Sequence, residues 1–335
     1  VLIINICMPD IQLPHYEVNL IGTLNQLSDH IGWGLRDLQI PSHWAETRGE
    51  GVTVMVIDSG LADHSDLGDN EDSKLSKSFI KESVKDVQGH GTHVSGIIAA
   101  KNNAVGVVGV APNAKIISVK ALNKYGKTND IILKEALEYA VKIKPDIINL
   151  SLGSFSPQPQ LESLYKKLTY ELNIPIVCAA GNFGNKGVMY PAKYPFTISV
   201  GSYKKDHKLS DFSAFSKEKF VDFVAPGDEI LSTYLKDEYA VMSGTSMAAP
   251  FLAGIMALLI SKYKKNGQSY TVEELRSVLQ SASIDVGAKG KDNKFGYGII
   301  NVERALREID GYGLSAEIKK DPWWKRLKEH LKFNC

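Results

Sequence analysis

Three short motifs carry residues that act together in hydrolytic chemistry: a carboxylate, an imidazole and a hydroxyl. Asp58 ends the apolar run "VIDSG", His90 lies between glycines in "GHGTHVSG", and Ser246 lies in "SGTSMAAP". A serine hydroxyl is too weak an acid to ionise at neutral pH, so a histidine must take its proton, and an aspartate can orient that histidine. The chain order Asp, His, Ser is one of the known orders of a catalytic triad.

Each motif alone has a simpler interpretation. An aspartate at the end of a strand is usually a turn former or a helix cap, and a serine in the first turn of a helix is often only a cap. His90 and His93 have a spacing that allows two metal ligands. However, no third ligand follows at zinc spacing, and the glutamate of a metalloprotease helix is absent. We therefore expect no metal at these histidines and a structural role for His93.

The elements that must position these residues alternate between strands and helices over roughly 200 residues. The predicted strands are residues 52–58, 116–122, 146–152, 174–180, 196–201 and 220–225, and the predicted helices include residues 129–142 and 161–172. Several strands are apolar throughout, as expected for parallel strands covered on both faces. This pattern predicts an α/β fold with a three-layer, doubly wound, mostly parallel sheet. Sites form beyond the carboxyl ends of such strands, where Asp58 falls.

Composition excludes several classes of protein. The chain has 335 residues, of which 44% are hydrophobic and 23% charged, with a formal net charge of +1. This balance gives no reason to expect a nucleic acid or a membrane as a partner. Cys7, Cys178 and Cys335 do not form a disulfide framework, which favours a reducing compartment. Residues 1–8 lack the basic start of a signal peptide. We therefore expect a cytoplasmic protein.

Taken together, the three motifs resemble those of the subtilisin family of serine proteases, over roughly residues 33–307. The resemblance implies a serine endopeptidase in which Ser246 is the nucleophile, His90 the general base and Asp58 the residue that orients the histidine. Asn182, in "CAAGN", matches the side-chain amide of the family's oxyanion hole, where it is paired with the backbone N–H of Ser246. Thr245 is expected to add a weaker hydroxyl contribution.

Two other functions compete with this one. One alternative is a catalytically silent binding protein on a subtilisin fold that has lost its activity. Nothing supports such a loss, because Asp58, His90, Ser246 and Asn182 are all present. An esterase of the α/β-hydrolase type would have a Gly-x-Ser-x-Gly motif and the order Ser, Asp, His. The order found here contradicts that type.

The resemblance also locates a substrate cleft. The edge at residues 151–154, including Ser151, Leu152 and Gly153, matches the strand that pairs with an extended peptide substrate. Ala179 and Gly181 match the opposite wall of the pocket for the side chain before the scissile bond (P1). Met189 matches the pocket base, and the alternative for it is simple packing. These residues predict broad specificity with a preference for medium apolar P1 side chains.

Calcium ions are the expected cofactors by the same resemblance. The matching strong site combines the side chains of Asp66 and Asn103 with the backbone carbonyls of Lys101, Val105 and Val107. Asp29 stands where the family has a glutamine ligand, and its alternative role is a solvated loop carboxylate. Mixed carboxylate, amide and carbonyl oxygens suit calcium. The carbonyls of Ala192, Tyr194 and Thr197, near a family turn that usually holds a cis proline, match a weak cation site.

The two ends of the chain lie outside the predicted catalytic domain, residues 29–310. Residues 1–28 show no clear periodicity and form an N-terminal extension. Residues 311–335 form a tail in which Asp321 and Pro322 can begin a short amphipathic helix. This helix docks on the domain or, alternatively, contacts another subunit or a membrane surface.

The extension resembles that of the intracellular subtilisins, which carry a Leu-Ile-Pro-Tyr motif. The matching residues here are Leu13, Pro14 and Tyr16, with His15 intervening. The hypothesis is autoinhibition: Leu13 fills the apolar pocket and Pro14 spoils the following bond for attack, until the extension is removed between residues 17 and 28. The alternative is a surface strand that packs elsewhere. The expected partners are peptide or protein substrates, the chain's own extension and, as in intracellular relatives, a second copy in a homodimer.

Overall fold

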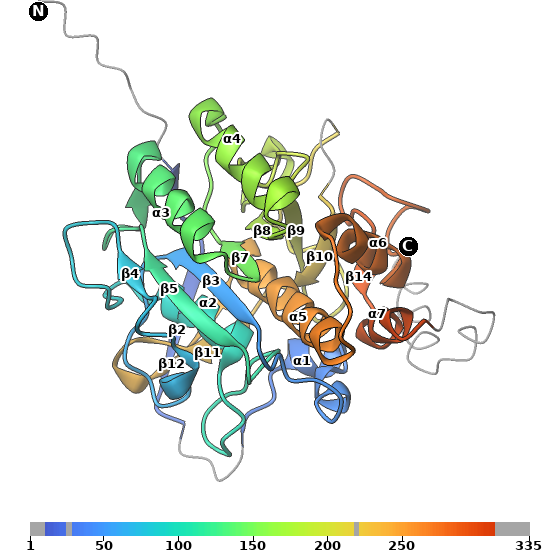
Figure 1. The fold of residues 1–335 in the computed structure, drawn as a ribbon, viewed down its shortest axis with the longest axis horizontal. Helices are drawn as coiled ribbons and strands as arrows, with labels where there is room; N and C mark the ends of the chain where they lie inside the picture. The colour runs from blue at the N-terminus through green and yellow to red at the C-terminus, as the bar shows by residue number, and fades with distance from the viewer. Residues whose placement is uncertain (1–10, 25–28, 218–220, 312–335) are drawn as a thin grey trace, which may run out of the picture.

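A computed structural model of the chain describes residues 11–24, 29–217 and 221–311. Its centre is a nine-stranded sheet (Figure 1). From one edge to the other, the strands are β13 (Ser283–Ile284), β14 (Ile299–Ile300), β10 (Phe223–Pro226), β9 (Ile198–Tyr203), β8 (Ile176–Ala179), β7 (Ile147–Leu150), β3 (Thr53–Asp58), β5 (Lys115–Lys120) and β4 (Lys77–Ser78). Every neighbouring pair is parallel except β13 and β14. The predicted mostly parallel sheet is therefore confirmed.

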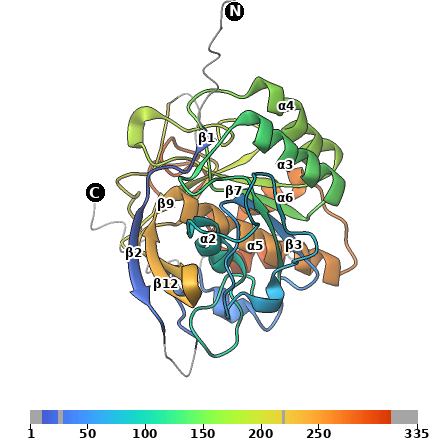
Figure 2. The same cartoon turned by 90° about the vertical axis from the view of Figure 1, so that its left-hand side faces the viewer.

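Helices cover both faces of this sheet, because its central strands are buried on both sides. Helices α2 (His90–Ala99) and α5 (Thr245–Lys265) pack against each other and the sheet, and α3 (Asp130–Ile143) and α4 (Pro159–Lys166) lie on the opposite face (Figures 1 and 2). The remaining helices are α1 (Trp33–Asp37), α6 (Val272–Ala282) and α7 (Val302–Ile309). This is the expected three-layer arrangement.

Helix α5 is the core helix of the protein. By length and composition it is the one described helix that is apolar enough to cross a membrane, but 94% of its most apolar stretch is buried inside the fold. It begins at Thr245, five residues before Pro250, and not after the proline. The predicted helix 161–172 also differs, because α4 ends at Lys166 and residues 167–171 form a π-helical turn.

Two smaller sheets were not predicted, and both include the extension. Strand β1 (Ile11–Gln12) pairs with β6 (Lys127–Thr128), and β2 (Glu17–Gly22) pairs with the hairpin of β11 (Ile230–Thr233) and β12 (Tyr239–Ser243). The hypothesis of an extended segment on the edge at residues 151–154 did not include the pairing with β6 or with β12. Strand β2 is almost entirely exposed: Val18 and Leu20 share one face, but that face is not buried. Its pairing therefore depends on the edge that β12 offers.

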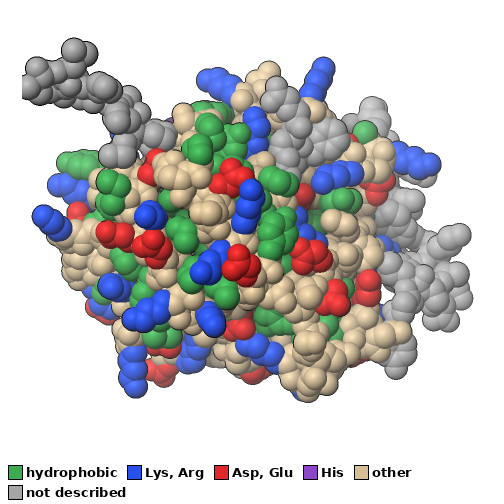
Figure 3. Space-filling view, turned by 45° about the horizontal axis from the view of Figure 1, so that its top comes forward, with side chains coloured by type: hydrophobic (Ala, Val, Ile, Leu, Met, Phe, Trp, Pro, Cys, Tyr) green, Lys and Arg blue, Asp and Glu red, His purple; other side chains and the backbone are tan. Residues whose placement is uncertain are grey.

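The surface mixes both signs of charge. On the face in Figure 3, Lys and Arg side chains are interspersed with Asp and Glu side chains and do not gather by sign. The predicted tail helix and its alternative contacts lie outside the described residues.

Candidate active site

Asp58 is the last residue of β3 and is fully buried. Both of its carboxylate oxygens lie 2.9 Å from Nδ1 of His90. Gly91 makes this approach possible, because a Cβ on it would lie 2.3 Å from the carbonyl oxygen of Gly60 and 3.2 Å from Cβ of Asp58. The glycine beside His90 therefore lets helix α2 begin directly against the end of β3.

His90 is the first residue of α2, and the carboxylate of Asp86 caps this helix. Asp86 accepts hydrogen bonds from the N–H groups of Gly89 and Thr92, both at 3.0 Å, and from the Thr92 hydroxyl at 2.8 Å. Sequence reasoning missed Asp86, although an aspartate just before a helix is a recognisable capping signal. Among the described residues, Nε2 of His90 is buried without a hydrogen-bond partner, so this nitrogen is free to accept a proton.

Ser246 is the second residue of α5 and is held from both sides by Ser151. Its hydroxyl donates to the carbonyl of Ser151 at 3.2 Å. Pro250 has no N–H to bond the carbonyl four residues earlier, which is that of Ser246. The hydroxyl of Ser151 donates to this carbonyl instead, at 2.9 Å. The proline in "SGTSMAAP" thus ties the backbone of Ser246 to Ser151, a role that sequence reasoning did not assign.

Asn182 follows β8 and points its amide nitrogen into the cleft, where it donates to the carbonyl of His15. Its amide oxygen is fixed by Thr245, whose N–H and hydroxyl donate to it at 2.9 and 2.8 Å. The Thr245 hydroxyl also accepts from the N–H of Gly181 at 3.0 Å. The Thr245 hydroxyl thus orients Asn182 in this structure, and its expected contribution to the oxyanion hole stays a prediction.

The segment of residues 11–16 occupies the cleft, and its first two residues form strand β1. Gln12 exchanges two backbone hydrogen bonds with Gly153, of 3.0 and 2.9 Å, on the predicted edge. On its other side this segment pairs with β6, and Leu13 donates to the carbonyl of Gly126 at 3.0 Å. Sequence reasoning found only one of these two edges. Peptide backbone is therefore bound here from both sides.

Leu13 does not take the predicted place in the apolar pocket. Its side chain packs against Gly126, on the wall opposite residues 151–154. The carbonyl at Asn182 belongs to His15, and the ring of Tyr16 lies 5.0 Å from that of His90. The prediction placed the carbonyl of Leu13 at this point of the cleft, and the structure places there the carbonyl of His15, two residues later. The reason is the register of β1, which no local pattern fixes.

Met189 lies between the two predicted walls of the P1 pocket. A Cβ on Gly181 would lie 2.8 Å from its sulfur, and one on Gly153 would lie 3.1 Å from its Cβ. Met189 is 2% exposed and Ala179 is 1% exposed. The thioether therefore fills space that two glycines leave open.

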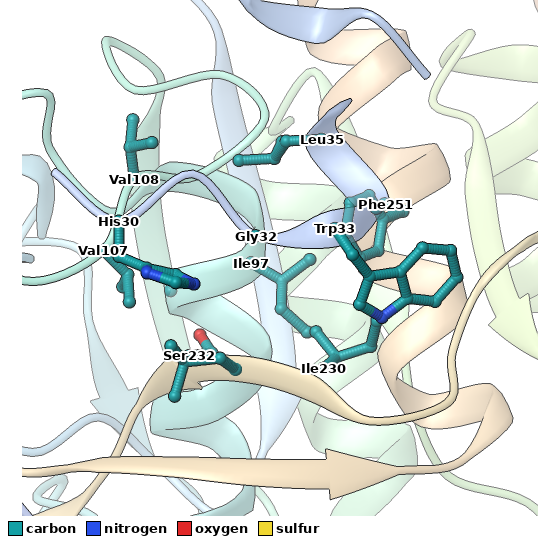
Figure 4. Close-up of a pocket in the computed structure, with 13 residues that line it drawn as sticks. His30, Gly32, Trp33, Leu35, Ile97, Val107, Val108, Ile230, Ser232 and Phe251 are labelled. Atoms are coloured by element: carbon teal, nitrogen blue, oxygen red, sulfur yellow. The ribbon is translucent and has the colours of Figure 1, made fainter. Parts of the chain in front are cut away.

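The crevice shown in Figure 4 is a different place. It lies between the segment before α1, helix α2 and strand β11, and its lining is mostly apolar, including Trp33, Ile97, Val107, Ile230 and Phe251. None of the three motif residues Asp58, His90 and Ser246 lines it. The motif residues meet instead under the N-terminal segment.

Residues 49–298 match the sequence profile of the Subtilase family. The chain belongs to the subtilase family. Similar proteins include the minor extracellular protease Epr of Bacillus subtilis (39% identical over 290 residues, 86% of this chain and 44% of the relative) and the intracellular serine protease of Paenibacillus polymyxa (42% over 248 residues, 70% and 74%). Subtilisin Savinase of Lederbergia lenta is 36% identical over 280 residues, which cover 83% of this chain and 99% of that protein.

These relatives define the reaction class. All three are named as proteases or subtilisins, and this subtilase is a serine endopeptidase. The chain spans less than half of the length of Epr. The names include both an extracellular and an intracellular protease.

His93 of the subtilase has a structural position. It is fully buried, and its Nε2 lies 3.0 Å from the carbonyls of Ile230 and Ala240. Burial lowers its pKa to about 3. The neutral ring therefore donates one proton to the β11–β12 hairpin and joins it to α2.

The residues predicted for the strong calcium site gather around Asn103. Its side-chain N–H donates to Asp66 at 3.3 Å and its backbone N–H donates to Asp29 at 3.2 Å. Asp66 is fully buried, and burial raises its pKa despite hydrogen bonds from the Val107 N–H and the Tyr239 hydroxyl, at 2.8 and 2.9 Å. These three donors to Asp66 are uncharged, so they leave the negative charge of the buried carboxylate unbalanced, a setting that suits a calcium ion.

Most of these ligands would be amide or carbonyl oxygens. No group of three His, Cys, Asp or Glu side chains gathers anywhere in the described part of the chain. The backbone of Lys101 adjoins the site through its N–H, which donates to the carbonyl of Asp66 at 2.7 Å. Val105 is exposed at the tip of this loop, and its N–H donates to Asn103 at 3.1 Å. The donor set as a whole fits calcium.

A charged side chain reaches the predicted weak cation site. The peptide bond between Tyr190 and Pro191 is cis, as expected. However, the guanidinium of Arg276 donates to the carbonyl of Thr197 at 2.5 Å, and the carbonyl of Tyr194 accepts from the Thr197 hydroxyl at 3.1 Å. A fixed positive charge repels a second cation at the same oxygen. This contact counts against a cation at Thr197, because Arg276, far away in the sequence, already supplies a positive charge there. The prediction of a weak site at Ala192, Tyr194 and Thr197 stays a prediction.

Proposed function

We propose that this subtilase cleaves peptide bonds through Asp58, His90 and Ser246 and is held inactive by its own residues 11–16. In the proposed reaction, Nε2 of His90 takes the proton of Ser246 as the hydroxyl attacks the substrate carbonyl. Asp58 holds the imidazole through Nδ1 and stabilises the imidazolium. His90 then protonates the leaving amine, and water hydrolyses the acyl-enzyme in the second half of the reaction.

The oxyanion of the intermediate needs donors that are already in place. The amide of Asn182, locked by Thr245, and the backbone N–H of Ser246 at the start of α5 are the proposed pair. A helix N-terminus adds positive potential at this point. Such preorganised donors usually provide the largest part of the stabilisation.

The observation that carries the autoinhibition proposal is the backbone pairing of residues 11–13 with both edges of the cleft. With this segment in place, His90 and Ser246 have no exposed surface. A substrate therefore has no access to the nucleophile until the segment leaves.

Pro14 supplies the reason why the segment is not itself a good substrate. After the bonded pair of Gln12 and Gly153, a regular antiparallel ladder would next bond Pro14 to Ser151. Proline has no N–H to donate, and the carbonyl of Ser151 accepts from the Ser246 hydroxyl instead. The nucleophile is thus bonded to the edge of the cleft and not to His90.

Removing the extension tests this proposal. Deletion of residues 1–18 should raise peptidase activity by about 10²-fold or more, since a tethered segment acts at an effective concentration on the order of millimolar. A sulfonyl fluoride should label Ser246 faster in the deleted enzyme, and Ser246→Ala should abolish both signals. Equal activity of the full chain and the deleted enzyme would rule out autoinhibition.

A matched variant separates inhibition by residues 11–16 from a purely structural role of this segment. Pro14→Ala in the full-length chain restores the missing N–H and should make self-cleavage near residues 14–16 faster, detected by mass spectrometry. A peptide of residues 9–18 added to the deleted enzyme should inhibit it competitively. Neither effect is expected if the segment is merely a surface strand.

We also propose that calcium binds at the loop carrying Asn103. Asp66 and Asp29 would supply carboxylate oxygens, Asn103 an amide oxygen, and Lys101, Val105 and Val107 carbonyls. The bound ion would stabilise this loop, which adjoins the C-terminal end of α2. The buried, unneutralised carboxylate of Asp66 supports this assignment.

We propose that the two edges of the cleft and Met189 determine the substrate specificity. Backbone pairing on two edges supports broad specificity, because it does not read side chains. Met189 between Gly153 and Gly181 supports medium apolar P1 residues over large or charged ones.

A further inference from the structure

The N-terminal segment does not end at the active site but continues along a second strand edge. Tyr16 lies against His90, and β2 begins at the next residue. Strand β2 then runs antiparallel to β12, from the pair Glu17 and Ser243 to the pair Leu20 and Ala240. Figure 2 shows β2 lying alongside β12. The path from the cleft to this edge is continuous.

Side chains contribute little to this pairing. Val18, Leu20 and Ile21 are 43%, 56% and 49% exposed, and Glu17 and Asn19 are exposed as well. Strand β2 is therefore held mainly by its backbone, which any sequence except proline can provide. An edge that binds a strand in this way tolerates different sequences.

The edge belongs to β12, which has one other neighbour among the strands of the described residues. Strand β11 pairs with its opposite side. Once β2 leaves, the backbone groups of residues 239–243 on the freed side have no strand partner. Ser243 lies at the end of this edge, three residues before Ser246. The free edge therefore begins next to the nucleophile.

The direction of the chain identifies what the edge binds. The carbonyl at Asn182 belongs to His15, and residues 17–22 follow it in the sequence. A substrate that runs through the cleft in the same direction would place its leaving-group side on β12. We propose that the outer edge of β12 is a docking strand for an extended polypeptide segment of about six residues C-terminal to the scissile bond. This inference rests on the proposed peptidase function and extends it.

The consequence is a preference for long, unfolded polypeptides. A folded substrate cannot offer six extended residues after the bond, and a short peptide ends before it reaches β12. Several backbone hydrogen bonds, each with a modest net contribution, should raise kcat/KM by about 10- to 100-fold. The enzyme would then act on partly unfolded chains more readily than on small peptides.

The test uses the full-length chain after it has processed itself, with its new N-terminus mapped by mass spectrometry. Peptides share one sequence before the scissile bond and carry two, four or seven residues after it. We expect kcat/KM to rise at least about tenfold between two and seven residues. A value that is constant beyond two residues would overturn the inference.

Backbone methylation provides the matched control. In an antiparallel pair, alternate residues direct their N–H groups to the partner strand. Two N-methylated versions of the seven-residue leaving group are therefore compared, one methylated at the odd positions and the other at the even positions. One version should lose the gain in kcat/KM, and the other should keep it. An equal loss of the kcat/KM gain in both peptides, or no loss in either, would contradict strand docking.

A competition experiment uses the chain's own sequence. The peptide Glu-Val-Asn-Leu-Ile-Gly, residues 17–22, should inhibit cleavage of the seven-residue substrate and leave the two-residue substrate unaffected. If no peptide is cleaved and Ser246 is not labelled by a sulfonyl fluoride, the peptidase function itself fails. If short peptides are cleaved without any effect of length, only the docking strand fails.

Discussion

Asn182 shows how one residue depends on its neighbours for its chemistry. An amide side chain in solution rotates freely, but two hydrogen bonds from Thr245 hold its oxygen and leave the nitrogen facing the cleft. In the proposed mechanism this donor is thus in place before the reaction begins, which is the condition for efficient stabilisation of an oxyanion.

Replacing this donor should affect turnover and not binding. Asn182→Ala is expected to lower kcat by about 10²–10³-fold, the size known for the loss of this donor in subtilisin itself. KM should change little, because the interaction forms fully only in the transition state. Steady-state kinetics on one peptide substrate would measure both. A parallel rise in KM with unchanged kcat would contradict this role.

Met189 allows a second prediction at this scale. Met189→Ala should enlarge the space between Gly153 and Gly181 and raise kcat/KM for substrates with Phe at P1, relative to Ala at P1, by roughly 10-fold. The magnitude corresponds to burial of about two additional methylene groups. A P1 peptide series would measure the ratio. Leu13→Ala is the matched control: Leu13 leaves the cleft with the inhibitory segment before a substrate binds, so this variant should leave the ratio unchanged.

At the scale of elements, helix α2 connects the active site to the edge that holds the extension. It begins at His90, capped by Asp86, and His93 fastens its next turn to the β11–β12 hairpin. Movement of this hairpin would therefore also move the helix that carries His90, the proposed general base.

His93 should make the fold sensitive to acid. Burial lowers its pKa from the ordinary histidine value of 6.5, which applies to the unfolded chain, to about 3 in the folded protein. Between these two values the unfolded chain binds a proton that the folded chain does not. Stability is fully present above pH 6.5 and falls as the pH drops towards 3, with a slope of up to about 1.4 kcal/mol per pH unit from this group. Urea denaturation of Ser246→Ala protein, which avoids autolysis, would measure it.

The control is the same measurement with His93→Gln. Glutamine keeps an N–H for the hairpin carbonyls but does not titrate. The variant should be less stable at pH 7 and should show a shallower loss of stability between pH 6.5 and 4. Parallel curves for the two proteins would show that His93 is not the group responsible.

For the whole molecule, the two predicted cation sites lead to opposite expectations. The loop around Asn103 leaves the buried carboxylate of Asp66 to be neutralised, whereas Arg276 already places a positive charge at Thr197. A chain can supply its own cation only where folding brings a basic side chain to the carbonyls, as α6 does here.

Calcium should therefore stabilise the protein, and monovalent ions should not do so specifically. In the Ser246→Ala background, calcium at about one hundred times its Kd should raise Tm by about 5–10 °C over the chelated protein. Asp66→Asn should remove most of this shift. Exchanging sodium for a bulky organic cation at constant ionic strength should leave Tm unchanged, and a clear fall would support the weak cation site.

The sequence by itself determined the class of enzyme and the class of the fold, and it proposed the catalytic residues. The residues Asp58, His90 and Ser246 lie in short motifs of glycine and small residues that are recognisable without any long-range information. The central strands are apolar throughout because both of their faces are buried, so their pattern is also local. Their predicted positions agree with β3, β5, β7, β8, β9 and β10 to within a few residues.

The tertiary structure alone decided which strands pair, in which register, and which charged side chain meets which carbonyl. The register that places His15 and not Leu13 at Asn182, the exposed strand β2, and the arginine at Thr197 all depend on partners distant in the sequence. Backbone pairing and the approach of a single charged side chain leave no periodic pattern in the segment concerned. These features exist only after the sheet and helix α5 have brought the cleft together.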